Sequence, residues 1–146
     1  MQDLELVKFG KGTQPHLLAF GSRDFWNIPL TGKPLTGTIA SRYETDLKDV
    51  RYSQTLFGDF DGDGDNDLLA IDATHHLVEF LRFTQGKDAV WHSVLHFRIF
   101  ELNGHYRGRK GGQNEPREGL VLDLDGDKKD DFVLLVHDRL LTYIQE

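Results

Sequence analysis

The chain of 146 residues contains no cysteine, which excludes disulfide bonds and thiolate metal sites. It also lacks any run of 18 apolar residues, so we expect no membrane-spanning helix. The opening MQDLELVKFGKG has neither the basic flank nor the apolar centre of a secretory signal. A basic stripe that would bind nucleic acid is missing too. We therefore expect a protein that stays inside the cell, or else a mature form or fragment of something longer.

What the chain does contain is enough apolar material for one folded domain, residues 1–146. Its hydrophobic content of 38%, with 11% aromatic residues, is typical of a globular protein with a real core. Its formal charge of −7 is concentrated, because the segments 59–67 and 123–131 hold ten aspartates and two lysines, a formal −8. The rest of the chain is nearly neutral, and two divalent cations would bring the total to about −3.

The apolar segments are short and bounded by Gly, Pro, Asn or Asp, which is typical of β-strands. Hairpins are predicted at 16–30, 67–83 and 132–144, and further strands at 4–9, 36–40, 54–58, 90–101 and 119–123. Only 44–52 is a candidate for a turn or two of helix. The pattern divides the chain into approximate units 1–50, 51–115 and 116–146, the last an incomplete or terminal one. Units of about four antiparallel strands must stack, so the expected fold is all-β, a partial β-propeller of about three blades.

Two segments of the chain carry a repeated spacing of acids. FGDFDGDGDNDLL, at 57–69, places aspartates at alternate positions, and like charges this close require solvent or a counter-ion. The spacing recurs after 64 residues in VLDLDGDKKDDFVL, again between two apolar segments. The first unit has FGKGTQPHLLAF at this place, without an aspartate, and we interpret it as a degenerate copy. The aspartates are Asp59, Asp61, Asp63, Asp65 and Asp67 in the first loop, and Asp123, Asp125, Asp127 and Asp131 in the second.

These residue types suit a hard divalent cation. Calcium takes six to eight oxygen ligands at about 2.3–2.6 Å. In the first loop we expect the side chains at positions 1, 3, 5 and 9 to turn inward. The backbone carbonyl of Asp65, at position 7, adds a ligand while its side chain points outward. Gly64, at position 6, permits the positive φ of the sharp bend.

An EF-hand loop opens in the same way and has to be considered. It requires an acidic residue at position 12 and flanking helices. Position 12 is Ala70 in the first loop and Leu134 in the second, each inside a strand-like segment. The EF-hand interpretation therefore fails for both loops.

The pattern D-x-D-x-D-G-x-x-D, after an apolar pair and before a strand, resembles the FG-GAP/VCBS repeats of integrin α-chain propellers and of many secreted bacterial proteins. FGDFDGDGDNDLLAID agrees at every ligand position, whereas LDLDGDKKDDFVLLV has Lys128 in place of the turn glycine. A side chain at positive φ costs roughly 1 kcal/mol, so we expect weaker calcium binding at the second loop. The resemblance covers two of the three units well and the first only by its hairpin. It implies calcium in both loops, a β-propeller, and an extracellular or periplasmic location.

The remaining candidate site is the long polar segment 104–118, GHYRGRKGGQNEPRE, since long loops in compact β domains are often functional. Its side chains suited to an anionic or glycan partner are His105, Tyr106, Arg107 and Arg109. Neither a nucleophile motif nor a Gly-rich phosphate loop is recognisable. We therefore predict a non-enzymatic, calcium-binding scaffold or binding module. The alternative is part of a calcium-dependent carbohydrate-active or carbohydrate-binding propeller. Expected partners are other blades of a parent protein or a second copy of the chain, with a protein or glycan ligand.

Overall fold

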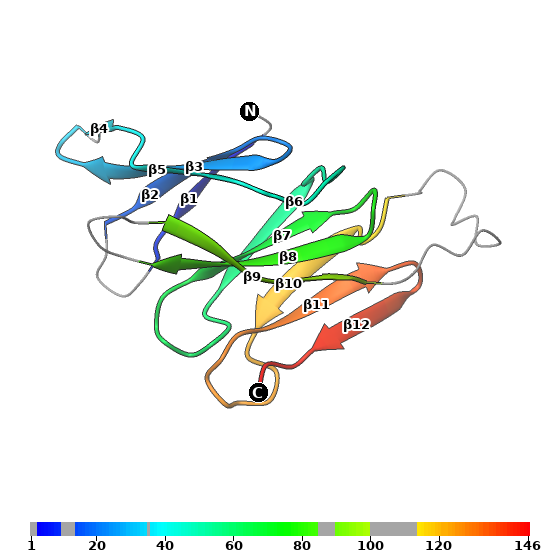
Figure 1. The fold of residues 1–146 in the computed structure, drawn as a ribbon. Coiled ribbons are helices and arrows are strands. Elements are labelled where there is room, and N and C mark those ends of the chain that lie inside the picture. Colours follow the sequence, from blue (N-terminus) through cyan, green and yellow to red (C-terminus); the bar gives the residue numbers. More distant parts are fainter. Residues whose placement is uncertain (1–2, 10–13, 35, 85–89, 100–113) are drawn as a thin grey trace.

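The computed structural model describes residues 3–9, 14–34, 36–84, 90–99 and 114–146. Within these ranges the chain is all-β, with three antiparallel sheets of five, four and three strands and no helix (Figure 1). The expectation of an antiparallel all-β fold is confirmed. The described ranges therefore contain no helix that is long and apolar enough to cross a membrane.

The sheets follow one another along the chain. The first contains β1 (Asp3–Val7), β2 (His16–Phe20), β3 (Asp24–Thr31), β4 (Thr36–Gly37) and β5 (Ser41–Glu44), in the order β1-β2-β3-β4, with β5 also paired to β3. The middle sheet has the order β6 (Gln54–Gly58), β7 (Asp67–Asp72), β8 (Leu77–Thr84), β9 (Val90–Arg98). The third has the order β10 (Glu118–Leu122), β11 (Asp131–Val136), β12 (Arg139–Tyr143).

The predicted hairpins are present, but two expectations were wrong. Among the described residues the first sheet has five strands where about four were expected, because β5 pairs with β3 beside β4. The third sheet has three strands and stops at β12, in the unit that was expected to be incomplete or terminal. The segment 44–52 forms no helix: it starts at the end of β5 and contains a turn in which Asp49 has a φ of 60°. Strand β5, which the sequence analysis missed, has the short alternating sequence SRYE, in which Arg42 pairs with Asp24 on the neighbouring β3.

The middle sheet packs between the other two, which places a core on each of its faces. All six residues of β7 are buried. Leu68 and Ala70 face the first sheet together with Phe25 and Tyr52, whereas Leu69 and Ile71 face the third sheet. A strand covered on both faces explains why the segment DLLAI is continuously apolar instead of alternating.

A buried carboxylate joins the first sheet to the middle sheet. Glu79, on β8, is 1% exposed. Its oxygens accept hydrogen bonds from the hydroxyls of Tyr43 (2.9 Å), Thr45 (3.1 Å), Ser93 (2.6 Å) and Tyr52. Several hydroxyl donors offset the cost of burying a charged group. Burial and the neighbouring carboxylate raise the pKa of Tyr43 to about 12, so this tyrosine remains a donor at physiological pH.

The middle and third sheets approach closely near the edge from which the acidic loops emerge. Strands β6 and β10 lie side by side there. A Cβ at Gly119 of β10 would lie 2.5 Å from Leu56 of β6, and a Cβ at Gly58 would lie 2.6 Å from Val121. A larger residue at either position would force a neighbouring side chain to shift, so the two glycines favour the observed close spacing of the sheets.

The outward face of the third sheet carries large apolar side chains. Leu120 and Leu140 are 69% and 67% exposed, and Leu122 and Ile144 are also exposed. The register places Leu120 opposite Val133 on the same face. The outward face of the first sheet also carries exposed leucines, since Leu4 and Leu6, two residues apart on β1, are 48% and 69% exposed. An apolar face on each end of the three-sheet stack is unusual for a monomeric protein.

Candidate metal loops

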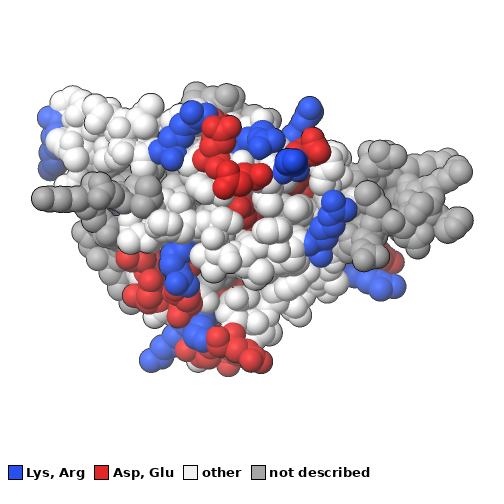
Figure 2. Space-filling view, in the orientation of Figure 1, with Lys and Arg blue, Asp and Glu red and all other residues white. Residues whose placement is uncertain are grey.

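The two acidic loops leave equivalent places in the fold. The first connects β6 to β7, and the second connects β10 to β11. Because these hairpins belong to adjacent sheets and run in the same sense, both loops lie at one edge of the molecule (Figure 1). Acidic side chains gather at this lower edge in the space-filling view, with a few basic ones among them (Figure 2).

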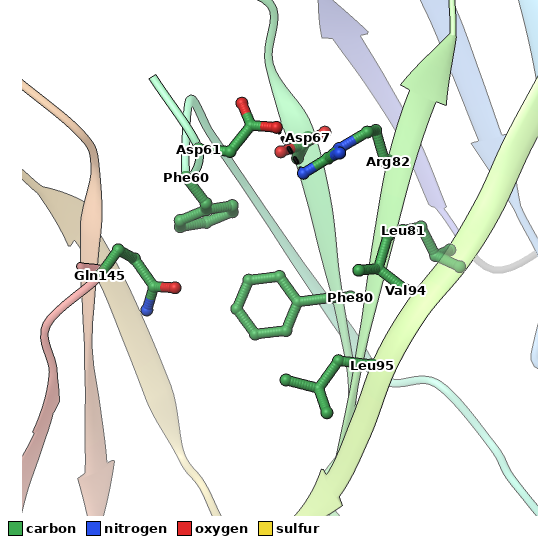
Figure 3. A pocket seen from close by; sticks show the side chains of 9 residues that line it. All are labelled: Phe60, Asp61, Asp67, Phe80, Leu81, Arg82, Val94, Leu95 and Gln145. Atoms are coloured by element: carbon green, nitrogen blue, oxygen red, sulfur yellow. Dashed lines mark ion pairs between the residues drawn. The ribbon is translucent and has the colours of Figure 1, made fainter. Parts of the chain in front are cut away.

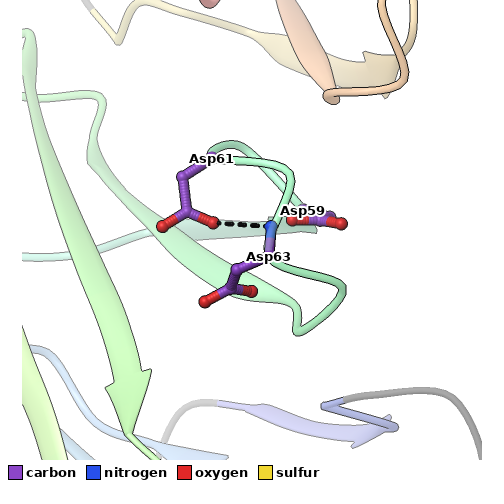
Figure 4. A group of neighbouring side chains, drawn as sticks. All are labelled: Asp59, Asp61 and Asp63. Carbon is purple, nitrogen blue, oxygen red and sulfur yellow. Dashed lines mark hydrogen bonds between the residues drawn. The ribbon is translucent and has the colours of Figure 1, made fainter.

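The first loop brings Asp59, Asp61 and Asp63 together, with one carboxylate oxygen of each within 4.8 Å of the others (Figure 4). Backbone N–H groups hold the carboxylates in place. Asp63 N–H donates to Asp61 Oδ1 (3.1 Å), Gly64 N–H to Asp59 Oδ2 (2.9 Å), and Asp65 N–H to Asp63 Oδ1 (2.8 Å). The alternation of aspartates therefore has a local cause, since each carboxylate accepts from a backbone group two or five residues later.

The second loop has the same internal hydrogen bonds at the offset of 64 residues. Asp127 N–H donates to Asp125 Oδ1 (3.1 Å), Lys128 N–H to Asp123 Oδ2 (3.1 Å), and Lys129 N–H to Asp127 Oδ1 (2.8 Å). The backbone bends are also equivalent. Gly62 and Gly126 have φ angles of 77° and 85°, and Gly64 and Lys128 have φ angles of 92° and 79°. The prediction that Lys128 takes the left-handed conformation of Gly64 is confirmed.

The clusters contain some, but not all, of the predicted ligands. The second one consists of Asp123, Asp125 and Asp131, whose oxygens lie within 4.8 Å of one another. Asp131 is fully buried and also accepts hydrogen bonds from the N–H groups of Leu124 and Gln145, each at 2.8 Å. Asp127 is not in this cluster. Its Oδ2 lies 3.9 Å from Lys129 Nζ.

Asp67, the predicted ligand at position 9 of the first loop, lies beside the cluster of that loop and is 7% exposed. Burial raises the pKa of its carboxyl to about 7; the charge of Asp61 acts in the same direction and that of Arg82 against it. Arg82, on β8, forms an ion pair with Asp61. A cation next to Asp67 would favour its ionised form, so cation binding near neutral pH would release a proton.

Arg82 and these two aspartates form one end of a small pocket of about 130 Å³ (Figure 3). The rest of its lining is mostly apolar and includes Phe60, Phe80 and Leu95. Arg82 was not predicted as a site residue, because a single arginine in an apolar strand does not indicate which acidic residue it will pair with. A pocket of this volume accommodates a few water molecules or one side chain.

Two features of the acidic loops suit a cation: the spacing of the carboxylate oxygens, and a buried carboxylate oxygen without a hydrogen-bond partner. Two oxygens bound to one calcium ion at about 2.3–2.6 Å lie at most about 5 Å apart, so oxygens within 4.8 Å of each other are close enough to share an ion. Among the described residues, Asp59 Oδ1 is buried without a hydrogen-bond partner. Burying an unpaired carboxylate oxygen is costly, and a cation would satisfy it.

The other predicted site residues, His105, Tyr106, Arg107 and Arg109, lie outside the described residues. At the edge opposite the acidic loops, two histidine–carboxylate pairs occupy turns, His75 with Asp72 (2.7 Å) and His137 with Glu115 (3.3 Å). Neither pair belongs to a group of three potential ligands within the described part of the chain. They cap turns instead: the Asp72 carboxylate also accepts from the N–H groups of Arg51, Thr74 and His75.

A scan of the sequence against protein-family models gives no match, and a comparison with curated proteins gives none either. The likeness to FG-GAP/VCBS repeats therefore rests on the residues and motifs of the two loops.

Proposed function

We propose that this protein is a calcium-binding repeat module of the FG-GAP/VCBS type that acts as a binding or structural scaffold. The observation that carries the proposal is the equivalence of the two loops. They share acid spacing, backbone bends and three internal hydrogen bonds at one fixed offset, and each gathers three carboxylates. Hydrogen bonds to the backbone account for the turn itself, but they leave three like charges crowded together in each loop, and a cation would neutralise them. Calcium would cancel the repulsion within each loop and fix it between its two strands.

The ligands in the first loop would be Asp59, Asp61 and Asp63, with the carbonyl of Asp65 and the carboxylate of Asp67 completing the set. In the second loop they would be Asp123, Asp125 and Asp131, with Asp127 turning inward from its contact with Lys129. The role of the ion is structural. Because the loops resemble the FG-GAP/VCBS repeats of secreted proteins, we propose an extracellular or periplasmic location.

We further propose that the three sheets are blades of a β-propeller. Antiparallel sheets that follow one another in the chain and stack face to face support this arrangement (Figure 1). The 64-residue repeat also explains the exposed face of the third sheet. Val133 and Leu135 correspond to Leu69 and Ile71, which are fully buried under the next sheet. The outward face of the third sheet is therefore built to receive another sheet, from a parent protein or from a second copy.

Calorimetric titration and thermal unfolding test the metal assignment. Millimolar calcium should raise the melting temperature of chelated protein, and titration should reveal two sites, the first loop being the tighter. Asp61→Ala should remove the tighter site. Asp138→Ala is the matched control, because it removes the same charge at a turn where the side chain is 92% exposed. Absence of any thermal shift in the wild type would exclude a calcium module.

Light scattering on the isolated chain tests the propeller assignment. Self-association is expected at high micromolar concentration, and Leu120→Asp should weaken it by placing a charge on the apolar face. Val94→Asp is the control, because Val94 is 58% exposed but lies on β9 of the middle sheet. A clean wild-type monomer at the same concentration would contradict the propeller while leaving the calcium assignment intact.

A further inference from the structure

The residue at position 8 of each acidic loop reaches back to the preceding unit. In the first loop this residue is Asn66, whose N–H donates to Phe9 O (2.6 Å) and whose side-chain amide donates to Lys8 O (2.9 Å). In the second loop it is Asp130. Its N–H donates to Asp59 O (2.8 Å), and its Oδ2 accepts from Asp59 N–H (2.8 Å). Both residues therefore make the same kind of link between neighbouring units.

The two links differ in what they hold. Asn66 contacts a hairpin that has no acidic loop, whereas Asp130 holds the backbone of Asp59, the first residue of the other cluster, on both its N–H and its C=O. Asp130 is also bonded directly to Asp131, a fully buried member of the second cluster. The stem of Lys129 passes close to Gly62, since a Cβ added at this glycine would lie 3.2 Å from Lys129 Cγ. One short segment, 129–131, thus belongs to the second loop and positions the first.

We infer that Asp130 couples the two cation sites, so that calcium at one loop increases the affinity of the other. This inference rests on the proposed function. A cation held by Asp131 fixes the peptide of Asp130, which in turn fixes Asp59 for the first site. The ordering is therefore achieved once for two binding events, which gives positive cooperativity. Direct electrostatics acts in the opposite direction, because one bound cation lowers the attraction of the neighbouring loop for a second. The sign of the coupling therefore distinguishes the two.

Calcium titrations of the full chain measure this coupling. Asp125→Ala disables the second loop and reports on the first; Asp63→Ala does the reverse, and neither substitution touches Asp59 or Asp130. We expect the remaining site in each variant to half-saturate at a calcium concentration about fivefold or more above the wild-type value, the lower end of usual allosteric coupling. Linkage requires similar factors in both directions.

Substitutions at the link identify its chemical basis. Asp130→Ala removes the acceptor of Asp59 N–H but keeps the backbone hydrogen bond from Asp130 N–H to Asp59 O, so it should clearly reduce the cooperativity. Asp130→Asn has the same charge as the alanine variant but retains an acceptor oxygen, so it should preserve cooperativity. Asn66→Ala, which removes the side-chain hydrogen bond of the equivalent link to the first unit, should leave the coupling unchanged.

The outcomes are distinct. Unchanged or tighter half-saturation in the Asp63→Ala and Asp125→Ala variants would overturn the coupling while leaving two calcium sites in place. Loss of cooperativity in Asp130→Asn as well as Asp130→Ala would assign it to charge and overturn the role of the hydrogen bond. Absence of calcium binding in the wild type would instead refute the proposed function itself. If Asp130→Ala fails to fold, the two loop variants still decide whether the sites are coupled.

Discussion

Lys128 occupies a backbone conformation that favours glycine, so its replacement by glycine provides a sharp test of the loop equivalence. Its φ is 79°, close to the 92° of Gly64, and its side chain is exposed. Lys128→Gly therefore removes little packing and retains the N–H that donates to Asp123. It also removes a positive charge from an acidic loop, which has to be separated from the backbone effect. Lys128→Gln makes that separation, because it loses the charge but keeps a side chain at positive φ.

The expected magnitude follows from two opposing terms. Relief of the left-handed strain stabilises the folded state by about 1–2 kcal/mol. Glycine also increases the freedom of the unfolded chain, which offsets about 0.5–1 kcal/mol. The difference predicts that Lys128→Gly is more stable than Lys128→Gln by about 0.5–1 kcal/mol. For a chain of this size that corresponds to a rise in melting temperature of about 1–4 °C.

Thermal unfolding of both variants, with calcium and with chelator, measures this difference. Titration of the same pair should show tighter calcium binding at the second loop in the glycine variant. Gly64→Ala supplies the converse experiment. No atom lies within 4 Å of a Cβ at that position, so its expected destabilisation arises from the positive φ alone. A glycine variant no more stable than Lys128→Gln would refute the equivalence of the two turns.

Two further predictions concern the body of the fold. Glu79→Gln places an amide donor among the hydroxyls of Tyr43, Thr45 and Tyr52. It should lower the free energy of unfolding, measured with urea, by about 3 kcal/mol. A change within experimental error would show that the carboxylate is not the acceptor at the sheet interface. Although its burial acts to raise it, the pKa of Asp72 is lowered by hydrogen bonds from the backbone of Arg51 and from His75. Asp72 therefore stabilises the fold above its ordinary pKa of about 3.9, and this contribution is lost as the pH falls through the lower folded-state value. Acid unfolding monitored by circular dichroism should show that loss in the wild type but not in Asp72→Asn, and identical pH profiles would contradict it.

Much of the local structure was predictable, because its causes lie within a few residues of one another. Strand β2 occupies 16–20 and β6 occupies 54–58, as their short apolar segments predict. The turns of both acidic loops were predictable as well, since each depends on an aspartate and a backbone N–H a few residues apart. The incorrect expectation of a helical turn at 44–52 also came from local sequence. A weak local preference for helix does not determine the conformation of a segment that lies between two sheets.

The choice of covered faces was not predictable from local patterns. Strands β7 (DLLAID) and β11 (DFVLLV) both follow an aspartate with a continuous apolar run, yet β7 is buried at every position while Val133 and Leu135 of β11 are only partly covered. What differs is the presence of a following sheet, which is a property of the stack and not of the strand. The number of strands in each sheet also depended on pairing partners, as β5 demonstrates.

The sequence by itself determined that the chain forms antiparallel strands. It also determined the position of the two equivalent acidic loops and the backbone bends within them. Strand alternation and aspartate-to-backbone hydrogen bonds act over only a few residues, which is why these features are local. Only the tertiary structure decided the partners of the charged side chains: Arg82 with Asp61, Asp130 with the backbone of Asp59, and Glu79 with the hydroxyl of Tyr43 on the first sheet. These partners are far apart in the chain or belong to different sheets, and each pairing depends on how the sheets pack. Packing of whole faces fixes that arrangement, so no short segment of sequence encodes it.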